Sequence, residues 1–178
     1  MKNNLKIPLE YFYKWEIKKP NETFLIQPID GNYHYFTWKK VGDQARRISN
    51  YINSLKLKPN SQIAIISKNC AHWIITDLAI MMSGHTSVPL YANVNGKTAK
   101  YILEHSEAKL VFIGKLEKYD WKEIKNNIPK RIIQIDFGYY GLDTKIKKWE
   151  DIITNTEPIK GSPLPVSYTH LRAHETDS

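Results

Sequence analysis

Two lysines stand where this chain could bind a phosphate group. Lys115 and Lys118 flank the carboxyl end of a strand that the sequence predicts over residues 109–113. In open α/β sheets, ligands bind at the carboxyl edge of the strands, and lysine ammonium groups attract phosphate. We therefore take Lys115 and Lys118 as the candidates for contact with a cofactor phosphate. The alternative is that both are solvated side chains in a lysine-rich chain.

Several histidines and acidic residues have structural explanations. His72 opens an apolar helix, a position that favours packing or capping over catalysis. His85 lies in a predicted helix-to-strand turn, where a turn role is favoured over a pocket role. The remaining polar cluster consists of Glu104, His105 and Glu107. Neighbouring helix positions diverge around the axis, so we expect this cluster to be a solvated face.

The motifs of the common chemistries are missing from this sequence. It contains no GxGxxG or GxxxxGK[ST] phosphate loop, no HExxH zinc motif and no GxSxG nucleophile motif. Cys70 is the single cysteine, which excludes a disulfide framework and a cysteine-based zinc site. His170 and His174 have the spacing of a metal pair on a helix, but we interpret them as accidental neighbours. The sequence thus assigns no catalytic residue and no metal ligand.

The segments that must position these residues alternate in type. Apolar periodicity predicts helices over residues 7–18, 38–55, 71–82, 97–106, 116–127 and 146–153. Apolar runs predict strands over residues 23–27, 33–36, 62–67, 86–90, 109–113 and 131–136. Thr37 is expected to cap the second helix and Asn69 the third, and Gly84 is expected to end the third. Pro89 places the strand 86–90 at an edge or the residue at a strand end.

This order indicates an α/β fold: a layered, mainly parallel sheet with flanking helices and right-handed crossovers. No internal repeat is visible, and no interior linker suggests a second domain. The chain of 178 residues is long enough to bury a core without disulfides or metal.

Charge and composition narrow the classes of partner. The 26 Lys and Arg residues exceed the 18 Asp and Glu residues, which gives a formal net charge of +8. The lysines are scattered, whereas nucleic-acid surfaces cluster Lys and Arg with aromatic readers, so we expect no nucleic-acid partner. No segment is long and apolar enough to be transmembrane, although contact with a membrane surface remains open. The N-terminus lacks a secretory signal, and a cytoplasmic location is expected.

The last fourteen residues differ in composition from the rest. All Lys, Ile and Asn residues precede residue 165, although about five would be expected in residues 165–178 at the upstream frequency. The string SYTHLRAHET resembles translated sequencing-adapter DNA. We therefore interpret residues 1–164 as native sequence and 165–178 as a foreign tail, outside the reasoning about fold and site.

Three segments, taken in order, resemble a known family. These are FTWKKVGDQARRISNYI, QIAIISKNCAHWIITDLAIMMSG and TSVPLYANVNGKTAKYILEHSEAKLVFIG. Together they are similar to the beginning of the AMP-forming acyl-CoA synthetases, and most similar to the long-chain fatty acid–CoA ligase branch. The resemblance covers about residues 5–155 and implies a partial N-terminal region of the large adenylate-forming domain. The branches that activate aryl or amino acids remain alternatives, as does a stand-alone basic α/β binding module.

The resemblance implies a reaction and its cofactors for the parent enzyme. Such enzymes convert a carboxylic acid and ATP, with Mg²⁺, to an acyl-adenylate, and then transfer the acyl group to coenzyme A. Their Ser/Thr/Gly-rich phosphate loop would begin where residues 165–178 stand, and their C-terminal lysine has no counterpart here. We therefore expect this chain alone to be inactive and to bind no cofactor of its own. Lys115 and Lys118 become candidates for contact with a CoA phosphate. We also expect one face of the sheet to lack its covering layer.

Overall fold

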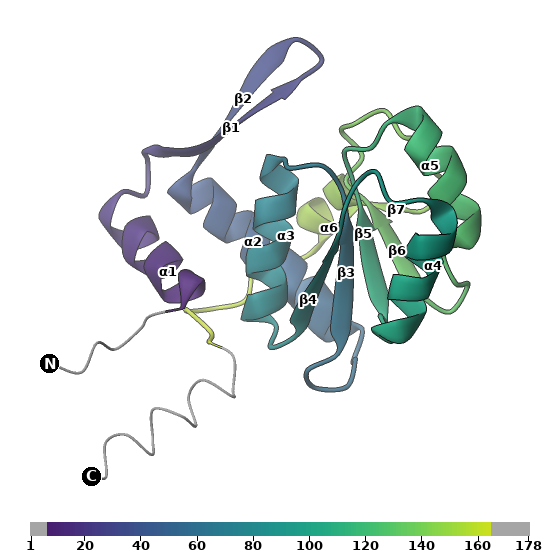
Figure 1. The fold of residues 1–178 in the computed structure, drawn as a ribbon. Helices are drawn as coiled ribbons and strands as arrows, with labels where there is room; N and C mark the ends of the chain where they lie inside the picture. The colour runs from purple at the N-terminus through teal and green to yellow at the C-terminus, as the bar shows by residue number, and fades with distance from the viewer. Residues whose placement is uncertain (1–6, 165–178) are drawn as a thin grey trace, which may run out of the picture.

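Apolar strands aligned in parallel form the centre of the protein. The computed structural model describes residues 7–164 (Figure 1). Its main sheet has the order β4-β3-β5-β6-β7, with every adjacent pair parallel. The strands are β3 (Gln62–Ile66), β4 (Thr86–Leu90), β5 (Leu110–Ile113), β6 (Ile133–Asp136) and β7 (Lys147–Lys148). Pro89 lies on β4 at the sheet edge, where a missing N–H donor is tolerated.

Helices cover both faces of this sheet because successive strand residues point to opposite sides. Ile63, Ile65 and Phe112 point into a core formed with α2 (Trp38–Ser54), α3 (Ala71–Met82) and α6 (Trp149–Asn155). Ala64, Ile66 and Val111 point into a second core formed with α4 (Gly96–His105) and α5 (Lys118–Ile124). A short 3₁₀ helix, η1 (Lys125–Asn127), follows α5, and α1 (Pro8–Lys18) packs against α2 and α3. The α/β fold class is confirmed, and the expectation of a bare sheet face is wrong.

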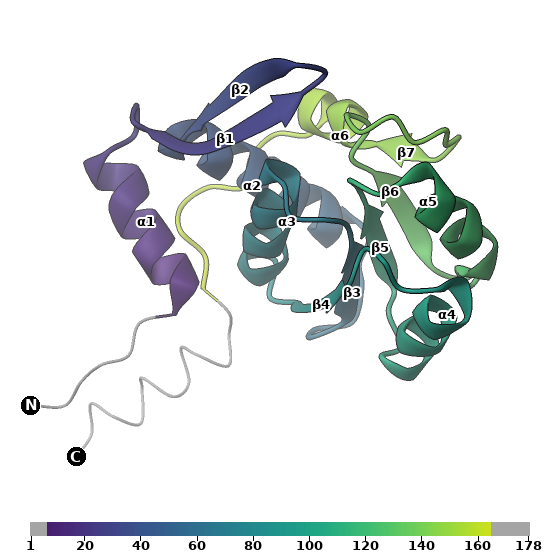
Figure 2. The same cartoon turned by 45° about the horizontal axis from the view of Figure 1, so that its top comes forward.

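A separate hairpin precedes α2. It consists of β1 (Thr23–Ile29) and β2 (Asn32–Thr37), joined at Asp30 and Gly31, which both have positive φ. Two such residues make the tight turn whose twist suits a hairpin. The hairpin reaches beyond the helical layer that carries it (Figures 1 and 2).

Two helix starts test the capping predictions. Thr37 caps α2 as expected, because its Oγ1 accepts the Lys40 N–H at 3.2 Å. Asn69 does not cap α3, so the prediction of this cap is wrong. Instead, the buried Gln27 of β1 accepts the Ala71 N–H at 2.9 Å. A long-range partner thus replaces the local cap, and no pattern near Asn69 signals it.

The fourth and fifth helices and the main strands fall close to their predicted places, but the segment after β6 differs. The predicted helix over residues 146–153 begins with the two-residue strand β7, and α6 starts only at Trp149. Lys147 and Lys148 pair with Ile135 and Asp136 of β6. Two lysines carry no strand signal, so the sheet's free edge decides their conformation.

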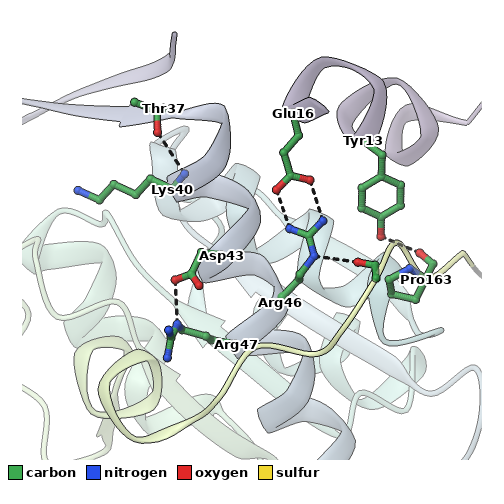
Figure 3. A network of polar contacts seen from close by, with 9 residues as sticks. Tyr13, Glu16, Thr37, Lys40, Asp43, Arg46, Arg47 and Pro163 are labelled. Carbon is green, nitrogen blue, oxygen red and sulfur yellow. Dashed lines mark hydrogen bonds and ion pairs between the residues drawn. The ribbon is translucent and has the colours of Figure 1, made fainter. Parts of the chain in front are cut away.

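The last described residues return to the N-terminal helix. The segment 156–164, here called the strap, crosses α2 and ends beside α1 (Figures 1 and 3). Arg46 of α2 holds Glu16 of α1 through two hydrogen bonds of 2.6 and 2.7 Å and donates from Nε to the Gly161 carbonyl at 3.0 Å. The Tyr13 hydroxyl donates to the Pro163 carbonyl at 2.7 Å. One guanidinium group therefore joins three segments that are distant in sequence.

Replacing Arg46 tests this junction. Both side chains of the Arg46–Glu16 pair are only 15% exposed, so Arg46→Ala leaves a largely buried carboxylate without its partner. We expect the free energy of unfolding to fall by about 3 kcal/mol, measured by urea denaturation. Lys39→Ala, at an exposed position of the same helix, should change it by less than about 0.5 kcal/mol. Equal effects of the two substitutions would show that the junction contributes nothing specific.

Candidate functional site

The chain order creates a crevice at the carboxyl edge of the sheet. From β3 the chain crosses one face through α3 to β4, and from β4 it crosses the other face through α4 to β5. The segments that follow β3 and β5 consequently leave toward opposite faces. Adjacent parallel strands whose connections diverge in this way mark the usual ligand-binding position in an open α/β sheet.

Ser67 joins the two segments at this crevice. Its Oγ accepts the Lys115 N–H at 2.9 Å and donates to the Lys68 carbonyl at 2.7 Å. The Lys68 N–H in turn donates to the Lys115 carbonyl at 2.8 Å. Gly114 permits this approach, because a Cβ there would lie 2.1 Å from the Phe137 ring and 2.7 Å from Ser67 Oγ. The backbone at Lys115 is therefore fixed from both sides.

Lys115 lines a hollow of about 650 Å³ at this edge. The apolar part of its wall includes Trp73, Leu90 and Tyr91, and a second cation, Lys68, lies on the same wall. Tyr91 is 86% exposed, so its ring is available to a ligand. Two cations beside aromatic rings suit a ligand that combines an anionic group with a flat or apolar one.

An acidic residue reduces the net positive charge at this edge of the sheet. Glu117 pairs with Lys68, and this contact lowers the pKa of the Glu117 carboxyl, with Lys115 adding a smaller effect in the same direction. Glu117 thus remains ionised beside the two lysines. The side chain of Lys115 forms no ion pair with another described residue, which leaves it as the cation most available to a ligand.

Lys118 lies in a different place from Lys115. As the first residue of α5, it lines a hollow of about 310 Å³ together with Trp121, Lys122 and Lys125. The three lysines share one face of the helix and its 3₁₀ extension because they are spaced by four and three residues. Sequence reasoning missed Lys122 and Lys125 as neighbours of Lys118, although their spacing could have indicated them. It also missed Lys68, which only the sheet topology brings beside Lys115.

His72 belongs to a buried aromatic cluster. Its ring stacks on Tyr139 at 4.4 Å between centroids and meets Trp149 edge-on at 5.3 Å. Its Nδ1 is hydrogen-bonded with the Tyr140 hydroxyl at 2.7 Å. Burial lowers the pKa of His72 from 6.5 to about 3, and nearby Lys40 and His34 add to the shift. The imidazole is therefore neutral and structural at neutral pH, which confirms the packing interpretation.

The other polar candidates are also structural. His85 follows Gly84, whose φ of +72° ends α3, and its N–H donates to the Ile80 carbonyl at 3.1 Å, which confirms the turn role. The side chains of Glu104, His105 and Glu107 are exposed, as expected for a solvated face. Among residues 7–164, no three His, Cys, Asp or Glu side chains come together as a metal site would require. His170 and His174 lie outside the described residues.

The arrangement matches a known enzyme family over most of the chain. The AMP-binding enzyme family matches residues 12–169. The chain belongs to this family. The match ends within the segment 165–178, whose foreign origin stays a prediction.

Relatives within the family support the same assignment. The chain is 35% identical over 111 residues to long chain acyl-CoA synthetase 2 of Arabidopsis thaliana, which covers 60% of this chain and 17% of that protein. It therefore spans about one sixth of the length of this relative. No helix among residues 7–164 has the length and apolar character needed to cross a membrane.

Solved structures of CoA ligases share the fold. An anthranilate CoA ligase, AuaEII, solved with anthranoyl-AMP, superposes with a TM-score of 0.74 at 16% identity, over 88% of this chain and 29% of that one. A benzoate CoA ligase from Burkholderia xenovorans LB400 gives a TM-score of 0.71 at 15% identity, over 89% and 30% of the two chains. At these identities the likeness concerns the fold. The layered sheet of this chain is therefore a fold that these two ligases also contain, over less than a third of their own length.

The buried His72 predicts how stability depends on pH. The pKa is lower in the folded than in the unfolded chain, so the unfolded chain binds more protons between about pH 6.5 and 3. The free energy of unfolding should therefore fall as pH falls through this window, with a contribution from His72 of up to about 1.4 kcal/mol per pH unit.

His72→Phe isolates this contribution in urea denaturation at several pH values. At pH 7 the variant should be less stable than the unmodified chain, because it loses the hydrogen bond to Tyr140. The difference should shrink as pH falls below about 6.5 and change sign before pH 4, because the accumulated loss from His72 then exceeds the free energy of one hydrogen bond. A difference that does not change with pH would contradict a neutral buried imidazole.

Proposed function

We propose that this chain is the N-terminal part of a long-chain fatty acid–CoA ligase. The parent enzyme would convert a fatty acid, ATP and CoA to acyl-CoA, AMP and pyrophosphate. The observation that carries the proposal is the sequence identity of 35% with a long chain acyl-CoA synthetase, together with the family match over residues 12–169. Several further relatives at similar identity carry names of the same kind, such as long chain acyl-CoA synthetase 4 of Arabidopsis thaliana at 30%.

The residues of this chain would bind and position rather than react. Lys115 and Lys118 would contact phosphate groups of CoA, with Lys68 supporting the first and Lys122 the second. The hydrogen bond between Ser67 and the Lys115 N–H would hold the Lys115 segment in place before CoA binds. Binding would then carry no entropic cost for ordering this segment. CoA, when bound, supplies the thiol that accepts the acyl group. Among residues 7–164, no nucleophilic side chain lies together with a base and a group that orients that base. We therefore assign no chemical step to these residues.

ATP and Mg²⁺ would be bound by the parent enzyme through parts that this sequence lacks. The sequence contains no Ser/Thr/Gly-rich phosphate loop, and residues 7–164 bring no three metal-ligating side chains together. We infer that the 178 residues alone do not catalyse adenylation. Preorganised N–H groups and a fixed cation, both supplied elsewhere in such an enzyme, would provide the stabilisation of charge that the reaction needs.

ATP–pyrophosphate exchange tests the inferred inactivity. The purified chain, incubated with ATP, Mg²⁺, labelled pyrophosphate and a long-chain fatty acid, should show no exchange above a control without protein. Robust exchange would sink this inference. Sequencing the source locus past codon 164 tests the parentage separately, because we expect the reading frame to continue into a Ser/Thr/Gly-rich phosphate loop. A native stop codon after residue 178 would argue against it.

Calorimetric titration tests the two lysine positions. CoA and dephospho-CoA should be titrated into the parent enzyme, completed by the reading frame past codon 164, and into its variants Lys115→Ala, Lys118→Ala and the exposed control Lys130→Ala. A true phosphate contact should weaken CoA binding by about fivefold on substitution, as loss of one partly exposed charge pair predicts. Lys130→Ala should change nothing. If neither candidate differs from Lys130→Ala, both lysines are solvent lysines.

Two alternative functions predict different ligands. If the parent enzyme, completed by the reading frame past codon 164, prefers aryl or amino acids to fatty acids in the exchange assay, it belongs to an aryl- or amino-acid-activating branch. A stand-alone basic binding module would show salt-sensitive binding of RNA or DNA by this chain at low salt. We expect no such binding, because the lysines are dispersed over the sequence.

A further inference from the structure

The exposed apolar side chains of the protein are concentrated near the N-terminus. Of the ten large apolar side chains that are exposed among the described residues, six belong to α1 and the hairpin. They are Tyr11, Trp15, Ile17, Ile26, Tyr33 and Tyr35. Single exposed apolar residues need no explanation, but a concentration on two adjacent elements indicates a surface that contacts something.

Helix α1 has two different faces. Leu9, Phe12 and Tyr13 point into the core, and Glu16 is held by Arg46. The helical repeat places Tyr11, Lys14, Trp15 and Lys18 on the opposite, solvent-facing side. This outer side therefore carries aromatic rings and cations together and no acidic residue.

Cations surround the exposed indole of Trp15. The Nζ atoms of Lys14, Lys18 and Lys19 lie 5.8, 5.9 and 5.6 Å from the centroid of its ring. Lys19 pairs with Glu22 at 2.8 Å, whereas Lys14 and Lys18 form no ion pair with a described residue. Trp38 supports the indole from within, at 6.4 Å between ring centroids. The ring is thus anchored on one side and open to solvent on the other.

The hairpin carries further exposed apolar side chains. Ile26 pairs with Tyr35 and Pro28 pairs with Tyr33 across the two strands, so these four side chains share one face of the hairpin. All four are exposed, while Gln27 and Phe36 on the other face are buried. The base of the hairpin is joined to α1 through Phe24, whose ring lies 6.1 Å from Phe12. Figure 1 shows both elements at the end of the molecule away from α4 and α5.

We propose that the outer side of α1 and the exposed face of the hairpin form a docking surface for an anionic lipid bilayer. Tryptophan and tyrosine favour the bilayer interface, where an apolar ring and a polar tip are both satisfied. Lysines beside them bury their methylene stems and direct their ammonium groups to lipid phosphates. The positive charge of the surface favours a bilayer over a second copy of the chain, because Lys14 and Lys18 complement negative headgroups and repel the same surface of another copy.

Vesicle co-sedimentation tests the proposal on the 178-residue chain. Vesicles of phosphatidylcholine alone should bind weakly, and vesicles that also contain phosphatidylglycerol should bind strongly, with binding that falls as salt rises. Equal binding to both vesicle types, or no binding to either at low salt, would overturn the proposal.

Matched variants locate the surface. Lys14→Gln/Lys18→Gln should lower the partition coefficient by roughly 25-fold, because each lysine near an anionic bilayer contributes about fivefold. Lys97→Gln/Lys100→Gln removes the same charge from exposed positions of α4 and should lower it by less than about twofold. Tyr33→Ser/Tyr35→Ser should lower it by about tenfold, as the loss of two inserted rings predicts. Equal losses in the α1 and α4 variants would show nonspecific attraction and contradict the assigned surface.

Two controls keep these outcomes interpretable. Circular dichroism of every variant should be unchanged, since all substituted side chains are exposed. Light scattering without vesicles should give a monomer mass for the chain and for each variant. A dimer that Tyr33→Ser/Tyr35→Ser dissociates would assign the surface to self-association and overturn the lipid proposal. Neither measurement depends on ligase activity, so the proposed function and this surface can fail independently.

Discussion

Strands β3 and β5 must bury both of their faces, and the rest of the structure follows from this requirement. Their side chains are apolar at odd and even positions alike, so neither face can be left to water. Helices α2, α3 and α6 cover one face, and α4 and α5 cover the other. Because the covering helices must lie on both sides, the connections after β3 and β5 diverge. The crevice is therefore a consequence of how the core is buried.

The candidate site lies at the edge of the sheet where the buried core borders an open hollow. Ser67, Gly114 and the backbone of Lys115 form a tight set of contacts that admits no additional atom. Outside this set, the Lys115 side chain, Lys68 and the rings of Trp73 and Tyr91 are arranged around an open hollow. A rigid backbone beneath adaptable side chains is the arrangement that lets a surface select a ligand at low entropic cost.

The sequence predicted those structural features that depend on neighbouring residues. The amphipathic repeat and the Thr37 hydroxyl predicted the extent and the start of α2, and apolar runs predicted both strands of the hairpin. The burial of His72 could be inferred from its apolar neighbours. Two structural features escaped prediction because they depend on distant partners: Gln27 caps α3 from another element, and β7 forms only because β6 offers a free edge. Lys68 and Lys115 meet through strand order, which periodicity does not encode.

The strap also sets the order in which this fold can be completed during synthesis. Tyr13 and Pro163 are 150 residues apart, and Arg46 and Gly161 are 115 residues apart, yet both pairs are hydrogen-bonded. Contacts of such separation form late, because the intervening chain must be ordered first. On the ribosome, α1 and α2 emerge early, but their partners in the strap are translated only after all strands of the sheet. The side chains of α1 and α2 that bind the strap therefore stay in water while the sheet assembles, and closure of the N-terminal layer follows assembly of the sheet.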